Sequence, residues 1–66
     1  MSNTSLTPRE QRICDLLVRG LTGKEIGMSL GISHRTVEDH RNQVLKKYKV
    51  RNAVELVRAV YGIAAE

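Results

Sequence analysis

Helix-start signals at four places divide this chain, and this division constrains its fold more than any other feature. Thr7 and Thr22 are each followed three residues later by glutamate, the spacing of a capping box at a helix N-terminus. Ser33 and Asn52 are residue types that cap helices well, and glycines mark the predicted ends of three segments. The chain is therefore predicted to be all-α, with helices at about residues 8–19, 23–30, 34–48 and 53–61.

The join between the second and third predicted helices has the outline of a helix-turn-helix. Ile26 and Leu30 give the short second helix an apolar face, and Gly31 follows it directly. Glycine reaches the left-handed conformation without steric cost, so a short turn here can set two helices at a steep angle. The sequence predicts a four-helix domain with a central helix-turn-helix, an outline that other helical hairpins share.

The length of the chain limits the functions open to it. A domain of 66 residues buries only about 60% of the surface of its unfolded chain, too little to enclose an enzyme pocket. We therefore expect no enzymatic activity and no cofactor. We expect residues 6–66 to form one domain, preceded by a flexible segment at residues 1–5.

Cysteine and histidine are too few for a metal site. Cys14 is the only cysteine and lies in an apolar helical pattern, which predicts a buried structural thiol. His34 and His40 are isolated from other metal ligands. The sequence has neither an apolar run long enough to span a membrane nor a signal-peptide layout, so we expect a cytoplasmic protein with no membrane partner.

The excess positive charge is concentrated around the third predicted helix. The net charge is +4, and residues 34–51 hold six Lys and Arg against two Asp and Glu, while the charges elsewhere cancel. A small basic domain favours an acidic partner, and nucleic acid is the commonest. The alternative is a solvated face of lysines and arginines.

The outward face predicted for residues 34–48 carries side chains that can read DNA bases. At about 100° per residue, Val37, Val44 and Tyr48 share one side and predict the buried stripe. The base-reading candidates on the opposite side and its flanks are Arg35, Glu38, Asp39, Asn42 and Gln43. Arginine can donate two hydrogen bonds to guanine, Asn or Gln can pair with adenine, and a carboxylate can accept from cytosine.

Residues around this face are candidates for contacts with the phosphate backbone. Hydroxyl and ammonium groups near a helix start bind phosphates and fix the orientation of a protein on the duplex. The candidates are Lys24, Ser33, Thr36, Lys46 and Lys47. Glu38 and Asp39 would repel phosphates, so they either face bases or pair within the helix with Asn42 or Arg35.

The fourth predicted helix has more apolar surface than one core contact needs. Its apolar arc holds Val54, Leu56, Val57, Val60 and Tyr61. The surplus predicts a contact with the same helix of a twofold-related partner, through Val54, Val57, Arg58 and Tyr61. The alternative is that a small domain uses every apolar residue it has, with Ala59 and Ile63 simply exposed.

Several blocks of residues, in register with the four predicted helices, also match a known pattern. They are Leu6-Thr7-Pro8-Arg9-Glu10, Gly20, Lys24-Glu25-Ile26, Leu30-Gly31-Ile32-Ser33, Thr36-Val37-Glu38, His40 and Val50-Arg51-Asn52. Together they resemble the LuxR/FixJ/NarL-type (GerE-like) DNA-binding domain, over roughly residues 6–61. The resemblance implies that the third helix reads the major groove and that the fourth pairs the subunits of a dimer.

The resemblance also assigns residues and shows departures. The positions that touch bases in such domains fall on Glu38, Asp39 and Asn42, and two of these are acidic where many relatives carry lysine. Gly27 stands where relatives usually have alanine, which costs roughly 1 kcal/mol of helix stability. Arg41 replaces an aliphatic residue, and we expect it to extend from the edge of the core toward a phosphate.

The leading hypothesis is a sequence-specific, dimeric transcription regulator that binds double-stranded DNA. The first alternative is an interaction module of the same fold that docks a regulator or RNA polymerase. The second is a promoter-reading fragment of a sigma factor. The chain is either a free-standing reader or a piece of a longer regulator, and the sequence leaves both open.

Overall fold

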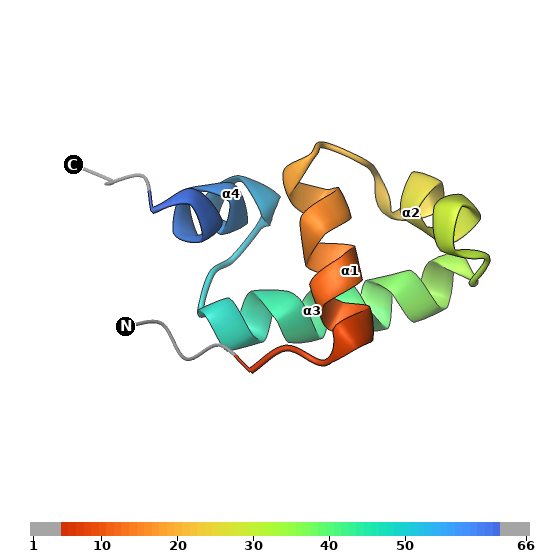
Figure 1. Cartoon of the computed structure of the whole chain (residues 1–66), viewed down its shortest axis with the longest axis horizontal. Coiled ribbons are helices and arrows are strands. Elements are labelled where there is room, and N and C mark those ends of the chain that lie inside the picture. Colours follow the sequence, from red (N-terminus) through yellow and green to blue (C-terminus); the bar gives the residue numbers. More distant parts are fainter. Residues whose placement is uncertain (1–4, 63–66) are drawn as a thin grey trace.

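The computed structural model describes residues 5–62, which form four helices and no strand (Figure 1). The helices are α1 (Pro8–Val18), α2 (Gly23–Leu30), α3 (His34–Tyr48) and α4 (Ala53–Tyr61). The predicted all-α fold is confirmed; α1 ends one residue earlier than expected because Arg19 is its C-cap. The division into a flexible segment 1–5 and a domain 6–66 stays a prediction, since residues 1–4 and 63–66 lie outside the described part of the chain.

Local hydrogen bonds fix where each helix begins. The Glu10 amide donates to Thr7 Oγ1 at 3.1 Å, and the Thr7 amide donates to Glu10 Oε1 at 3.0 Å. Thr22 and Glu25 form the same reciprocal pair at the start of α2. α3 and α4 begin at the predicted serine and asparagine caps. The helix starts therefore follow from side chains within a few residues of one another, as the capping patterns predict.

Residues in the left-handed conformation follow three of the helices. Gly31 (φ 71°) follows α2, and Gly62 (φ 69°) follows α4. Lys49 (φ 59°) follows α3 and, among the described residues, is the one non-glycine residue with a positive φ. Because a side chain in this region crowds the next carbonyl, the end of α3 holds about 1–2 kcal/mol of backbone strain.

The longest helix, α3, is the base on which the other three are arranged. Figure 1 shows α1 crossing α3 steeply, with α2 beside the N-terminal part of α3 and α4 near its C-terminal end. All four helices contribute to one core, and α1 and α3 supply three buried apolar side chains each. The buried apolar residues are Ile13, Cys14, Leu17, Ile26, Val37, Val44, Leu45 and Leu56. The three packed helices leave the opposite side of α3 open to solvent.

Gly27 lies where the helix-turn-helix is most tightly closed. A Cβ atom at this position would lie 2.8 Å from the Ile32 carbonyl oxygen and 3.5 Å from Val37 Cγ2. The Ile32 amide donates to the Gly27 carbonyl at 3.0 Å, so the turn backbone folds back onto α2. Glycine at this position, in place of the alanine expected from the family pattern, thus allows the turn to approach α2 closely.

Candidate nucleic-acid interface

The residues predicted to read bases lie on the solvent side of α3. Arg35, Asp39, Asn42 and Gln43 are exposed, whereas Val37 and Val44 on the other side are fully buried. Glu38 lies between these two sides and is partly exposed. The structure therefore brings all five base-reading candidates onto one helix with their polar ends accessible, which is the arrangement needed to present side chains to a groove of DNA.

Glu38 is held by two basic side chains of its own helix. His34 Nε2 lies 3.2 Å from Glu38 Oε2, and Arg41 Nη1 lies 4.0 Å from Glu38 Oε1. The sequence allows pairing of this acid with Asn42 or Arg35, and in the structure its partners are instead His34 and Arg41. The His34–Glu38 contact has the i,i+4 spacing of neighbours on a helix surface, a signal that is present in the sequence.

The start of α2 closes over this pair. A Cβ atom at Gly23 would lie 2.7 Å from Glu38 Oε2 and 3.1 Å from the His34 ring. The neighbouring Lys24 is exposed at the first turn of α2. Gly23 therefore allows α2 to approach the Glu38 carboxylate closely, and the lysine next to it lies at the edge of the α3 face.

The first turn of α3 presents hydroxyl groups that are also used in capping. The Thr36 amide donates to Ser33 Oγ at 3.1 Å, and the Ser33 and Thr36 hydroxyls are 2.9 Å apart. Ser33 is exposed and Thr36 is half-buried. The dipole of α3 places partial positive charge at this end, so the turn is suited to an anionic partner.

The two lysines near the end of α3 differ in their surroundings. Lys46 is exposed on the solvent side of the helix. Lys47 Nζ donates to Glu10 Oε1 at 2.7 Å and to the Ser5 carbonyl at 3.0 Å. The expectation that Lys47 contacts phosphate is not supported by this placement, because its ammonium group is bound to a buried carboxylate of α1. Sequence spacing gave no sign of this pair, whose members are 37 residues apart.

Glu10 is the one buried charged residue among the described residues. The bond from Lys47 lowers the pKa of Glu10 below its usual value, the Thr7 amide acts in the same direction, and burial opposes them. The carboxylate therefore stays ionised at neutral pH and holds the lysine close to α1.

The outer face of α4 exposes apolar side chains. Val54 is 66% exposed and Tyr61 is 63% exposed, while Val57 lies between them half-buried. Arg58 is exposed on the same side. Leu56, which the sequence placed in the same apolar arc, is fully buried in the core. Four residues of α4 that do not enter the core therefore form one accessible stripe at helical spacing. They are Val54, Val57, Arg58 and Tyr61.

Residues 5–62 hold no cluster of histidine, cysteine and acidic side chains arranged for a metal ion. Cys14 is buried as predicted, and burial raises the pKa of its thiol. The thiol is therefore protonated at neutral pH, in keeping with a packing role. Over the same residues, no helix is both long and apolar enough to cross a membrane.

A family comparison and the individual relatives both point to bacterial regulatory proteins. The family of bacterial regulatory proteins described as the luxR family (GerE) matches residues 4–60. The chain is 41% identical over 56 residues to the transcriptional regulatory protein UhpA of Escherichia coli K12, covering 85% of this chain and 29% of that protein. It is 47% identical over 53 residues to the transcriptional regulatory protein FixJ of Azorhizobium caulinodans, covering 80% of this chain and 25% of that protein.

A solved structure supports the same relationship. The response regulator StyR matches this chain with a TM-score of 0.84 and 43% sequence identity, over 88% of this chain and 29% of that one. The chain thus spans between about a quarter and a third of the length of these three proteins. The similarity is to a part of each of them, and in StyR that part has the same arrangement of helices.

Proposed function

The chain belongs to the luxR family of bacterial regulatory proteins, and from this premise we propose that it binds DNA in transcription regulation, reading the major groove with α3. The observation that carries the proposal is the polar face of this helix. Arg35, Asp39, Asn42 and Gln43 are exposed opposite a fully buried apolar stripe. A helix with this division can enter a groove without disturbing the core that holds it.

The dimensions of α3 suit this task. Its 15 residues extend about 22 Å, and the major groove of B-DNA is about 12 Å wide, enough for one helix. Arg35 would donate to guanine, and Asn42 or Gln43 would pair with adenine. Asp39 would accept a hydrogen bond from the amino group of cytosine, directly or through water.

Glu38 is proposed as a second acidic reader whose charge is partly balanced. His34 and Arg41 lie 3.2 and 4.0 Å from its two carboxylate oxygens. Of these two partners, the Arg41 guanidinium reduces the repulsion between the carboxylate and the phosphates of the duplex. Both partners also orient the side chain, which favours one hydrogen-bond direction toward a base edge.

The proposed phosphate contacts surround this face. Lys24 lies at the start of α2, Ser33 and Thr36 form the first turn of α3, and Lys46 lies near its end. Arg41 is half-buried and would reach a phosphate past Glu38. Lys47 is left out of this set, since its ammonium group binds Glu10.

We further propose that two copies pair through α4. Val54 and Tyr61 are exposed, with Val57 and Arg58 on the same stripe, so the surface is apolar with a polar edge. A twofold contact between identical stripes would bury both and leave each α3 free. Readers of this kind bind half-sites about 34–36 Å apart, one turn of DNA, so we expect a pseudo-palindromic target.

The test is selection from a randomised duplex pool with the purified chain at two salt concentrations, followed by sequencing of the bound DNA. We expect one palindromic sequence to be enriched, with affinity falling steeply as salt rises, because phosphate contacts release counterions. Weak binding without enrichment at both salt concentrations would contradict the proposal and favour the interaction-module hypothesis.

A further inference from the structure

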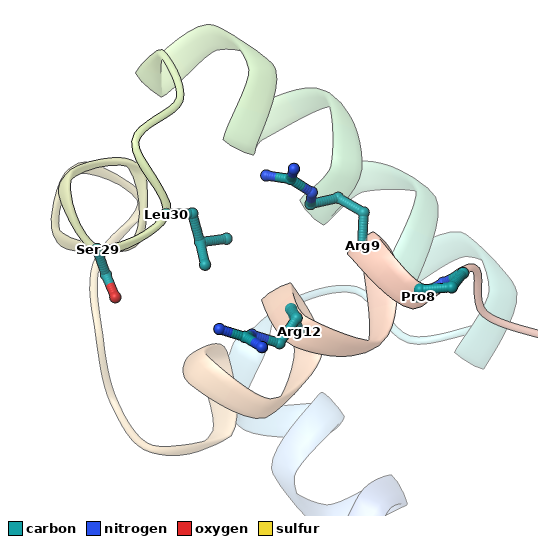
Figure 2. A pocket seen from close by; sticks show the side chains of 5 residues that line it. All are labelled: Pro8, Arg9, Arg12, Ser29 and Leu30. Carbon is teal, nitrogen blue, oxygen red and sulfur yellow. The ribbon is translucent and has the colours of Figure 1, made fainter.

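A groove runs between α1 and the end of α2, away from the residues proposed to bind DNA. Its first part is a hollow of about 380 Å³ lined by Pro8, Arg9, Arg12, Ser29 and Leu30 (Figure 2). An adjoining hollow of about 440 Å³ is lined by Arg12, Asp15, Leu16, Arg19 and Ser29. The two share an arginine and a serine, so they form one continuous surface, which we call the α1–α2 groove.

The α1–α2 groove is strongly basic. Arg9, Arg12 and Arg19 follow one another at spacings of three and seven residues, which places them on one face of α1. Figure 2 shows the side chains of Arg9 and Arg12 reaching from α1 toward α2. None of the three arginines forms an ion pair with another residue of the described range 5–62. Asp15 is the one carboxylate in the lining, and it accepts a hydrogen bond from Gln11 at 3.0 Å.

Apolar surface lies between these charges. Leu16 and Leu30 are both half-buried, and Pro8 is exposed at the first turn of α1. Leucines and a proline beside guanidinium groups that form no ion pair within residues 5–62 make a surface that can bury apolar side chains and bind carboxylates around them. Protein interfaces have this composition, with an apolar centre, a polar rim and a high content of arginine.

The groove and the α3 face use separate residues. No residue of α3 lines either hollow. The residues proposed to read bases are exposed on the side of α3 turned away from Val37 and Val44, which pack into the core with α1 and α2. A partner in the groove and a duplex on α3 can therefore be bound by different side chains of the same molecule.

We propose that the α1–α2 groove binds an acidic segment of a partner protein. Aspartate or glutamate side chains of the segment pair with Arg9, Arg12 and Arg19, and apolar side chains pack against Leu30 in the first hollow and Leu16 in the second. Guanidinium groups bind carboxylates through two parallel hydrogen bonds, which gives such a contact direction as well as strength. The inference rests on the groove alone and does not depend on DNA binding by α3.

The test is titration of the isotope-labelled chain with a short synthetic peptide of aspartate, glutamate and leucine, followed by NMR. We expect the largest amide shifts at Arg9, Arg12, Ser29 and Leu30. A peptide with asparagine and glutamine in place of the acids should bind at least about tenfold more weakly. Shifts confined to α3 and its basic residues would overturn the proposal, as would equal affinity for the amide peptide.

Matched variants separate the groove from net charge. The double variant Arg9→Gln with Arg12→Gln should weaken peptide binding about tenfold or more, and the double variant Arg19→Gln with Arg51→Gln should have a smaller effect, because only one of its changes lies in the groove. Arg51→Gln alone should leave binding within about twofold, since it lies between α3 and α4 and lines neither hollow. Equal losses in all variants would show that only net charge matters and would contradict the proposal.

The same variants distinguish a protein partner from DNA. In a titration with duplex DNA, Arg9→Gln with Arg12→Gln should leave affinity and salt dependence within about twofold of the wild type. A large loss of DNA affinity with a shallower salt dependence would assign these arginines to phosphates, and the groove would then not be the site of an acidic protein segment.

Discussion

The ammonium group of Lys47 lies 2.7 Å from Glu10 Oε1, and this bond joins the end of α3 to the start of α1. The same oxygen accepts the Thr7 amide at 3.0 Å, so one buried carboxylate both caps α1 and binds α3. Glu10 is buried while the Lys47 side chain is 33% exposed, so removing the lysine leaves a buried carboxylate without its cation, which is costly. This relationship makes Lys47 a structural residue although it belongs to a basic stretch.

Replacing Lys47 tests this role. Lys47→Met should lower the free energy of unfolding by about 1–3 kcal/mol, because it leaves the Glu10 carboxylate buried without its cation. Lys46 is the exposed neighbour, and Lys46→Met should change the free energy of unfolding by less than about 0.5 kcal/mol. Urea unfolding followed by circular dichroism measures both. DNA titrations should show the reverse order, with Lys46→Met losing affinity and folded Lys47→Met retaining it. Similar stability of the two variants would contradict the assignment.

Acid should weaken the fold through Glu10. Its pKa is lowered from the usual 4.5 in the folded state, chiefly by the bond from Lys47. A group with a lowered folded pKa stabilises the protein above its unfolded pKa, and this contribution is lost as the pH falls through the folded value. The contribution is thus complete at neutral pH and declines below about pH 4.5.

Urea unfolding at a series of pH values measures this effect. In the wild type, the free energy of unfolding should fall below about pH 4.5, and Glu10→Gln should show a shallower fall. Glu25→Gln is the control, because it changes the other capping box and leaves the Glu10 pair intact, so it should keep the acid-dependent loss that arises from Glu10. Identical pH profiles for wild type and Glu10→Gln would refute the role of this carboxylate.

The end of α3 can be relieved of strain. Lys49 has φ 59°, where glycine is favoured, so Lys49→Gly should raise the free energy of unfolding by about 1 kcal/mol. Gly31 has φ 71° with nothing near its missing Cβ, so Gly31→Ala should lower the free energy by a similar amount through backbone strain alone. Urea midpoints measure both changes. A destabilised Lys49→Gly would indicate that the lysine side chain contributes more than its backbone costs.

Asn42 should determine preference at a single base position. Asn42→Ala removes an exposed amide from the middle of α3 and should cost about 1–3 kcal/mol on the preferred site, with less effect on sites that differ at that base. Lys46→Ala is the comparison, since loss of a phosphate contact weakens all sequences alike and reduces the salt dependence. Affinities for a panel of single-base variants measure this difference, and an equal loss on every duplex would exclude a base contact by Asn42.

The exposed stripe of α4 allows a test of dimerisation that spares the core. Val54 is 66% exposed, so Val54→Glu should prevent pairing without unfolding the chain. Ala59→Glu adds the same charge on another exposed side of the helix and should leave pairing intact. Sedimentation velocity, with circular dichroism as a check on folding, compares the two. A Val54→Glu protein that still sediments as a dimer would place the interface elsewhere.

The sequence alone was sufficient for the four helices and for the face that α3 buries. Helix starts depend on hydrogen bonds over three residues, such as the one between Thr7 and Glu10, so they can be identified from spacing. Helical periodicity placed Val37 and Val44 inside and Asn42 outside, because the angle between residues of a helix is fixed. The base-reading candidates on α3 were found by the same argument.

Tertiary structure decided which charged groups meet across the fold. Lys47 and Glu10 are 37 residues apart, and no local rule indicates that their helices cross at that point. Glu38 had several possible partners at helical spacing, and the structure pairs it with His34 beneath the start of α2. The α1–α2 groove depends on the same packing. Capping hydrogen bonds and periodicity act within a few residues, whereas the Lys47–Glu10 pair and the α1–α2 groove depend on how whole helices are placed, and that placement is set by the packing of the shared core.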